Sequence, residues 1–138
     1  MSAAPAPDVP AQFQTFLAFD FGHKRTGVAV GNRMLRTATG QPTIRAEGSA
    51  RLQQALARIR EWQPDGLVVG VPFHPDGASH DNTARARKFA RQLRAASGLA
   101  VHEVDERYST VEAQAAGARD ADAGAACVIL EQFLRSLP

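Results

Sequence analysis

The chain has 138 residues, 44% of them apolar, and a formal net charge of +2. This length suits a single domain with a sizeable core, and no apolar run approaches the ~18 residues that a membrane-spanning helix needs. With so small a net charge, the overall charge of the chain does not by itself indicate a nucleic-acid partner.

The N-terminal stretch, residues 1–14, is rich in Ala and Pro and has no charged segment followed by an apolar one. We therefore expect a flexible tail rather than a signal peptide, followed by one domain over residues 15–138. The single cysteine, Cys127, cannot form an internal disulfide. Both features predict a cytoplasmic protein with no membrane partner.

The first two predicted strands, residues 16–21 and 27–31, contain the most informative segment of the chain. Asp20 lies at the end of the first strand, and Gly22 and Gly27 flank the turn between the two. A carboxylate at a strand end beside glycines suits a site where a metal ion or a phosphate must approach the backbone. A solvated Asp that starts a hairpin turn fits the same residues, so this segment alone leaves both interpretations open.

The rest of the chain alternates between strands and helices, with loops that contain Gly and Pro between them. The apolar residues Leu52, Leu56 and Ile59 have the i, i+4, i+7 spacing of a helix. The further predicted strands are residues 34–38, 67–71 and 99–104, the predicted helices are residues 49–62, 81–97, 108–118 and 122–137, and the predicted loops are residues 39–48 and 72–79. This order indicates an α/β protein with a mixed sheet covered by helices.

Three more acids lie where open α/β sheets form ligand sites. Asp105 and Glu106 directly follow the strand at residues 99–104, and Asp122 begins the last helix on the same face as its apolar stripe. Taken alone, Asp122 fits a helix N-cap better than a ligand. Together with Asp20, these acids can converge on one rim, and hard divalent cations such as Mg²⁺ prefer carboxylate oxygens. Two such ions about 3.5–4 Å apart can clamp the attacking and leaving oxygens of phosphodiester hydrolysis.

The sequence offers no competing chemistry. It has no pair of cysteines for zinc, and its four histidines are too scattered for a ligand motif. Neither a nucleophile elbow nor a phosphate-binding loop of the Walker type is present. The acids are therefore the best candidates for catalysis.

Basic residues are concentrated in one predicted helix. Five of the sixteen fall within residues 85–94 with no acid among them: Arg85, Arg87, Lys88, Arg91 and Arg94. Arg87 and Arg91 are four residues apart and share a helix face, which suits contacts to the phosphates of a nucleic acid. A solvated helix face explains the same cluster.

Four ordered motifs give the chain a specific resemblance to a known family. They begin at Asp20 (DFGHKRTGVAV), Val69 (VGVPFHPDG), Asp105 (DERYSTVEA) and Asp122 (DAGAACVIL). Over roughly residues 16–136, the chain resembles the YqgF-type (RuvX) family of Holliday-junction-resolvase-like proteins, whose members are described as nucleases of precursor 16S rRNA.

The resemblance implies a ribonuclease-H-like fold, with a mixed five-stranded sheet flanked by helices. It also implies a hydrolase that cleaves phosphodiester bonds during 5′-end maturation of 16S rRNA, with Mg²⁺ or Mn²⁺ as its cofactor. The catalytic and metal-binding residues it implies are Asp20, Glu106 and Asp122, with Asp105 as a weaker metal ligand. The expected nucleic-acid contacts are Lys24, Arg25, Arg87, Arg91, Arg107, Ser109 and Thr110.

Other functions stay open from the sequence. Structured DNA is an alternative substrate, because relatives were first viewed as junction resolvases, and a non-catalytic RNA-binding factor of ribosome assembly would keep the same fold. ATP-binding proteins of the sugar-kinase and actin type open with a similar Asp-x-Gly hairpin but need two such domains.

The expected partners are precursor rRNA or structured DNA and assembly intermediates of the small ribosomal subunit, and the expected oligomeric state is a monomer or a weak homodimer. The family usually has a longer, Lys-rich stretch where residues 114–120 have Arg119 as their only base.

Overall fold

The structure, a computed structural model, describes residues 9–72, 81–105 and 121–138. The predicted helix at residues 108–118 and most of the predicted loop at residues 72–79 lie outside the described residues. The elements follow in the order β1 (Thr15–Phe21), β2 (Thr26–Asn32), β3 (Thr37–Ile44), α1 (Gly48–Trp62), β4 (Gly66–Val71), α2 (Asp81–Ser97), β5 (Ala100–Asp105) and α4 (Ala121–Ser136).

The described strands form one mixed sheet in the order β3-β2-β1-β4-β5. β1, β2 and β3 are antiparallel neighbours, whereas β4 is parallel to both β1 and β5. Every residue of β4 is buried, as expected for a parallel strand covered on both faces. The predicted mixed five-stranded sheet is therefore confirmed.

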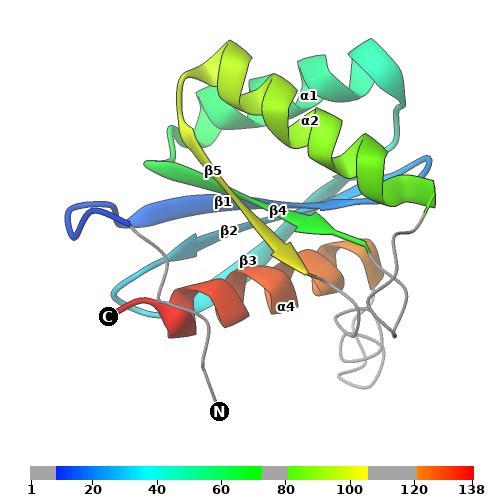
Figure 1. Cartoon of the computed structure of the whole chain (residues 1–138). Helices are drawn as coiled ribbons and strands as arrows, with labels where there is room; N and C mark the ends of the chain where they lie inside the picture. The colour runs from blue at the N-terminus through cyan, green and yellow to red at the C-terminus, as the bar shows by residue number, and fades with distance from the viewer. Residues whose placement is uncertain (1–8, 73–80, 106–120) are drawn as a thin grey trace.

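Helices cover both faces of the sheet, so the protein has three layers (Figure 1). α1 and α2 pack on one face over a cluster that includes Leu17, Phe19 and Val69. α4 packs on the other face over a cluster that includes Phe16, Ala18 and Val68. Side chains of β1 alternate between the two clusters, as the pleat of a strand requires. We call these the α1/α2 face and the α4 face.

The third strand differs from the prediction. It spans Thr37–Ile44, where we expected a strand over residues 34–38 and then a loop. Met34 and Leu35 lie in the turn before it and are 81% and 70% exposed. The Asn32 side chain accepts hydrogen bonds from both of their backbone N–H groups at 2.8 and 3.3 Å, which fixes the turn. Gly40 and Pro42 made this segment resemble a loop, but an edge strand tolerates both.

The start of the described chain is anchored to the sheet, although it belongs to the stretch for which we expected a flexible tail. The Asp65 carboxylate accepts hydrogen bonds from the backbone N–H groups of Gln14 and Thr15 at 2.8 and 3.0 Å. Phe13 packs against the cluster under α4. Residues 1–8 lie outside the described part, so a flexible tail there stays a prediction. None of the described helices is long and apolar enough to cross a bilayer.

Candidate nuclease site

Asp20 lies at the end of β1, in the middle of the sheet. Its Cα partners are Gly27 on antiparallel β2 and Gly70 on parallel β4. Strand alternation puts Asp20 on the face of Phe16 and Ala18, which is the α4 face. The residue is only half-buried. Asp20 thus lies between two glycines, and its carboxylate projects from the α4 face of the sheet.

Gly27 brings the start of α4 next to this carboxylate. A Cβ atom placed on Gly27 would lie 1.9 Å from the backbone oxygen of Asp122. No side chain fits in that space, so the first turn of α4 can approach β2 only because residue 27 is glycine. The backbones of Asp20 and Asp122 therefore lie on two sides of Gly27, although the two residues are far apart in the sequence.

Arg25 adds a positive charge to this pair of acids. Its Nε atom lies 3.2 Å from Oδ2 of Asp122, and the two side chains are 56% and 27% exposed. Such a half-exposed ion pair contributes little to stability. The structure thus gives Arg25, an expected nucleic-acid contact, a carboxylate partner, and it leaves Lys24 exposed on the same turn.

Asp105 reaches the same edge of the sheet but starts from the opposite face. It is the last residue of β5 and pairs with Val71 of β4. Because side chains alternate along β5, Asp105 lies on the same face as Val101 and Glu103. Val101 packs against the cluster under α1 and α2, and Glu103 forms an ion pair with Arg87 of α2. Asp105 is therefore a poorer companion for Asp20 than the sequence suggested.

Several predicted site residues lie outside the described residues: Glu106, Arg107, Ser109 and Thr110. Within residues 9–72, 81–105 and 121–138, no three His, Cys, Asp or Glu side chains are grouped closely enough to hold a metal ion. The described part thus supplies two of the three acids that the resemblance implies, and Glu106 follows directly after its last residue on β5.

The basic residues of α2 divide between two sides of the helix. Arg87 lies 3.4 Å from Glu103 of β5, measured from Nε to Oε1, so an acid from another element lies beside the cluster. Arg91, one turn further, is exposed. Arg85 and Lys88 instead line a pocket between α1 and α2. That Arg87 and Arg91 contact nucleic acid stays a prediction, and nothing in residues 85–94 indicated the Glu103 carboxylate beside Arg87.

Sequence reasoning missed Arg51. The spacing of Leu52, Leu56 and Ile59 predicted the first helix, and all three pack in or against the cluster under α1 and α2. The helix also buries Arg51 and Ala55, which that spacing did not indicate. Arg51 is only 3% exposed. A charged residue within a helix is normally read as solvent-facing, so nothing in the pattern indicated its burial.

Comparison with known proteins identifies the family. Residues 14–136 match the RuvX family, described as Holliday junction resolvase. The chain belongs to the RuvX family. A relative from Polaromonas sp. (strain JS666 / ATCC BAA-500) is 70% identical over the full length of both chains, and one from Albidiferax ferrireducens is 66% identical over 98% of this chain and 88% of its own. Both are named "Putative pre-16S rRNA nuclease".

The fold of the family member agrees with that of a solved structure. RuvC of T. thermophilus, determined in complex with a Holliday junction substrate, superposes with a TM-score of 0.52 at 15% identity, covering 88% of this chain and 94% of that one. At this identity the likeness concerns the fold alone. It confirms the predicted ribonuclease-H-like architecture.

Proposed function

We propose that this RuvX-family chain is a divalent-metal-dependent nuclease that hydrolyses phosphodiester bonds in precursor 16S rRNA, at the 5′ end. The observation that supports the proposal is the close approach of the Asp122 backbone to Gly27, which is the Cα partner of Asp20. Relatives that match the full chain are named as nucleases of this RNA. In this proposal the protein acts in the cytoplasm, as a monomer or weak homodimer, on assembly intermediates of the small ribosomal subunit.

The residues present fit a hard divalent cation. Asp20 and Asp122 offer carboxylate oxygens, which Mg²⁺ and Mn²⁺ prefer, and both residues are half-buried. When bound, such a cation would stabilise the negative charge that develops on the scissile phosphate and activate a water. Glu106 is proposed as the third ligand, and Asp105 as a weaker one because it starts from the other face.

The chain's own residues would then hold and orient the substrate. Arg25 keeps the Asp122 carboxylate in place at 3.2 Å and is exposed enough to reach a phosphate as well. Lys24, Arg87, Arg91, Arg107, Ser109 and Thr110 are proposed as further contacts to the nucleic acid. Guanidinium groups suit this role because their fork of N–H groups matches phosphate oxygens.

Cleavage of an RNA that contains the 5′ leader of precursor 16S rRNA tests the proposal. We expect cleavage with Mg²⁺ or Mn²⁺, none with EDTA, and none by purified Asp20→Asn protein in either metal. Asn has almost the same volume as Asp but lacks the charge, so the fold should persist. A four-way DNA junction, run in parallel, tests the substrate class. Cleavage of the junction alone would contradict the RNA assignment, and binding of RNA without cleavage by either metal would favour a non-catalytic assembly factor.

A further inference from the structure

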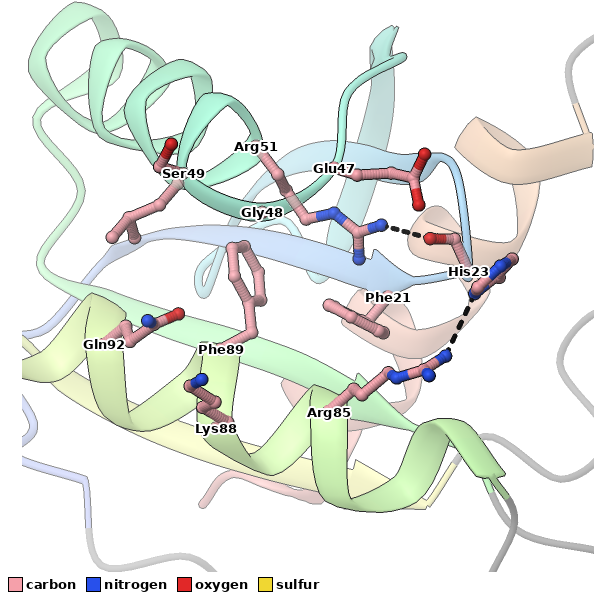
Figure 2. A pocket seen from close by; sticks show the side chains of 11 residues that line it. Phe21, His23, Glu47, Gly48, Ser49, Arg51, Arg85, Lys88, Phe89 and Gln92 are labelled. Atoms are coloured by element: carbon pink, nitrogen blue, oxygen red, sulfur yellow. Dashed lines mark hydrogen bonds between the residues drawn. The ribbon is translucent and has the colours of Figure 1, made fainter.

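A pocket of about 460 Å³ lies on the α1/α2 face, between the start of α1, the first half of α2 and the turn after β1. Figure 2 shows Phe21 and Phe89 at its apolar wall, with Arg51, Arg85 and Lys88 around it. Because Asp20 projects from the α4 face, this pocket is separate from the proposed nuclease site. Pockets of this volume fit a small organic ligand.

Arg51 is a buried cation with part of its guanidinium unpaired. Its Nε atom donates to the Ala46 carbonyl at 3.1 Å and its Nη2 atom to the His23 carbonyl at 2.5 Å. Its Nη1 atom is buried and has no hydrogen-bond partner. The guanidinium carbon lies 4.0 Å from the centre of the Phe21 ring. A buried N–H group of a charged side chain is costly when unpaired, so an anion in the pocket would satisfy it.

The start of α1 opens onto the same pocket. Gly48 and Ser49 are its first residues and line the pocket, and the preceding Glu47 makes no side-chain hydrogen bond to the helix. The first turn of α1 contains no acid. A Cβ atom on Gly48 would meet nothing within 4 Å, so the space beside its backbone is open. Uncapped backbone N–H groups and the helix dipole favour a negative group here.

α2 supplies two more positive charges on the side of the pocket that faces α1. Arg85 and Lys88 are exposed and line the pocket opposite α1. The Nη1 atom of Arg85 lies 3.1 Å from Nδ1 of His23 (Figure 2). Arg can only donate, so the guanidinium of Arg85 is the donor in this contact. Glu47 is the acid among the lining residues, so the lining cations outnumber it by three to one.

We propose that this pocket binds a nucleotide through its phosphate. The phosphate would accept hydrogen bonds from the start of α1 and from Arg51, Arg85 and Lys88, while the organic part packs on the apolar wall. A phosphate alone is too small to fill the pocket, which is why a nucleotide fits better than inorganic phosphate. The nucleotide is either free or part of a nucleic-acid strand, and in the second case the inference rests on the proposed function.

The test is an NMR titration of the full chain in EDTA, so that it does not depend on cleavage. The probes are adenosine 5′-monophosphate, adenosine, inorganic phosphate and an RNA tetranucleotide with a 5′ hydroxyl. We expect the monophosphate to shift the amide signals of Gly48 and Ser49 and to bind more tightly than either adenosine or inorganic phosphate. Binding of the tetranucleotide with equal or higher affinity assigns the site to a strand, and weaker binding assigns it to a free nucleotide.

A double variant of exposed residues makes the proposal falsifiable without unfolding the protein. Arg85→Gln/Lys88→Gln should weaken monophosphate binding by about tenfold or more, as expected for the loss of charge-assisted hydrogen bonds. The control, Arg60→Gln/Arg135→Gln, removes two exposed charges away from the pocket and should bind as the wild type does. Equal binding by adenosine, shifts centred elsewhere, or equal affinity in the two double variants would overturn the proposal. If Arg51 served only to stabilise the fold, the two double variants would bind the monophosphate with equal affinity.

Discussion

Gly27 is the residue that allows the start of α4 to approach β2 next to Asp20. It is the Cα partner of Asp20 in the sheet, and its missing side chain admits the backbone of Asp122. A helix can approach a sheet this closely only where no Cβ intervenes. The approach of α4 to β2 therefore depends on a position that carries no functional group.

Gly27→Ala should destabilise the fold and reduce cleavage together. The new Cβ would lie 1.9 Å from a backbone oxygen, so α4 must move away from β2. We expect a loss of about 1–3 kcal/mol in the free energy of unfolding, the usual range for overpacking, as measured by urea denaturation. The matched control is Gly40→Ala, where the nearest atom is the Ala123 methyl at 3.1 Å. An equal loss in both variants would contradict the importance of this approach.

His102 predicts a pH-dependent stability. Burial lowers the pKa of His102 below its ordinary value of 6.5, its Nε2 atom is buried without a partner, and its ring lies 5.1 Å from that of Phe133. Between the folded and unfolded pKa values, the unfolded chain binds more protons, so stability rises with pH. The contribution is complete above pH 6.5 and is lost as the pH falls towards the folded pKa.

A series of denaturation curves at different pH values checks this prediction. His102→Phe removes the titrating group and can still pack on Phe133, so its stability should depend less on pH below 6.5 than that of the wild type. The other three histidines remain in both proteins and serve as the internal control. If the stability of the two proteins changed with pH in the same way, the pKa of His102 would be the same in the folded and unfolded chains, which contradicts the prediction.

At the scale of elements, α2 presents two surfaces rather than one basic face. Arg87 lies beside Glu103 of β5, whereas Arg85 and Lys88 line the pocket with α1. An acid on a neighbouring strand lowers the positive potential that five bases create on the helix. Residues 85–94 contain no acid, so only the packing of β5 beside α2 shows that Glu103 lowers the positive potential there.

Glu103→Gln should strengthen nucleic-acid binding if the β5 side of α2 contacts phosphates. Removing the carboxylate raises the positive potential around Arg87 and Arg91 without changing the size of residue 103. We expect tighter binding of the leader RNA and a salt dependence steeper by about one slope unit. Arg87→Ala/Arg91→Ala should change both quantities in the opposite direction. Unchanged salt slopes in both variants would mean that this side of α2 is only solvated.

At the scale of the whole molecule, the sequence predicted the fold better than the site. Apolar periodicity and turn residues located β1, β2, β4, β5, α1, α2 and α4. β3 was misplaced because an edge strand can contain Gly and Pro. Arg51 is buried, and Asp105 starts from the face of the sheet opposite to that of Asp20. Both features depend on tertiary packing, which the identity of one residue does not reveal.

The most direct test of the account measures where a divalent ion binds. Mn²⁺ broadens the NMR signals of nearby amides, so it reports the position of the metal in the full chain. We predict broadening centred on Gly27 and Ala123, with little effect at Gly98, which lies beyond the end of α2, and loss of this pattern in Asp20→Asn. Broadening centred on another part of the chain, or the same pattern in Asp20→Asn, would contradict a metal site built on Asp20 and Asp122.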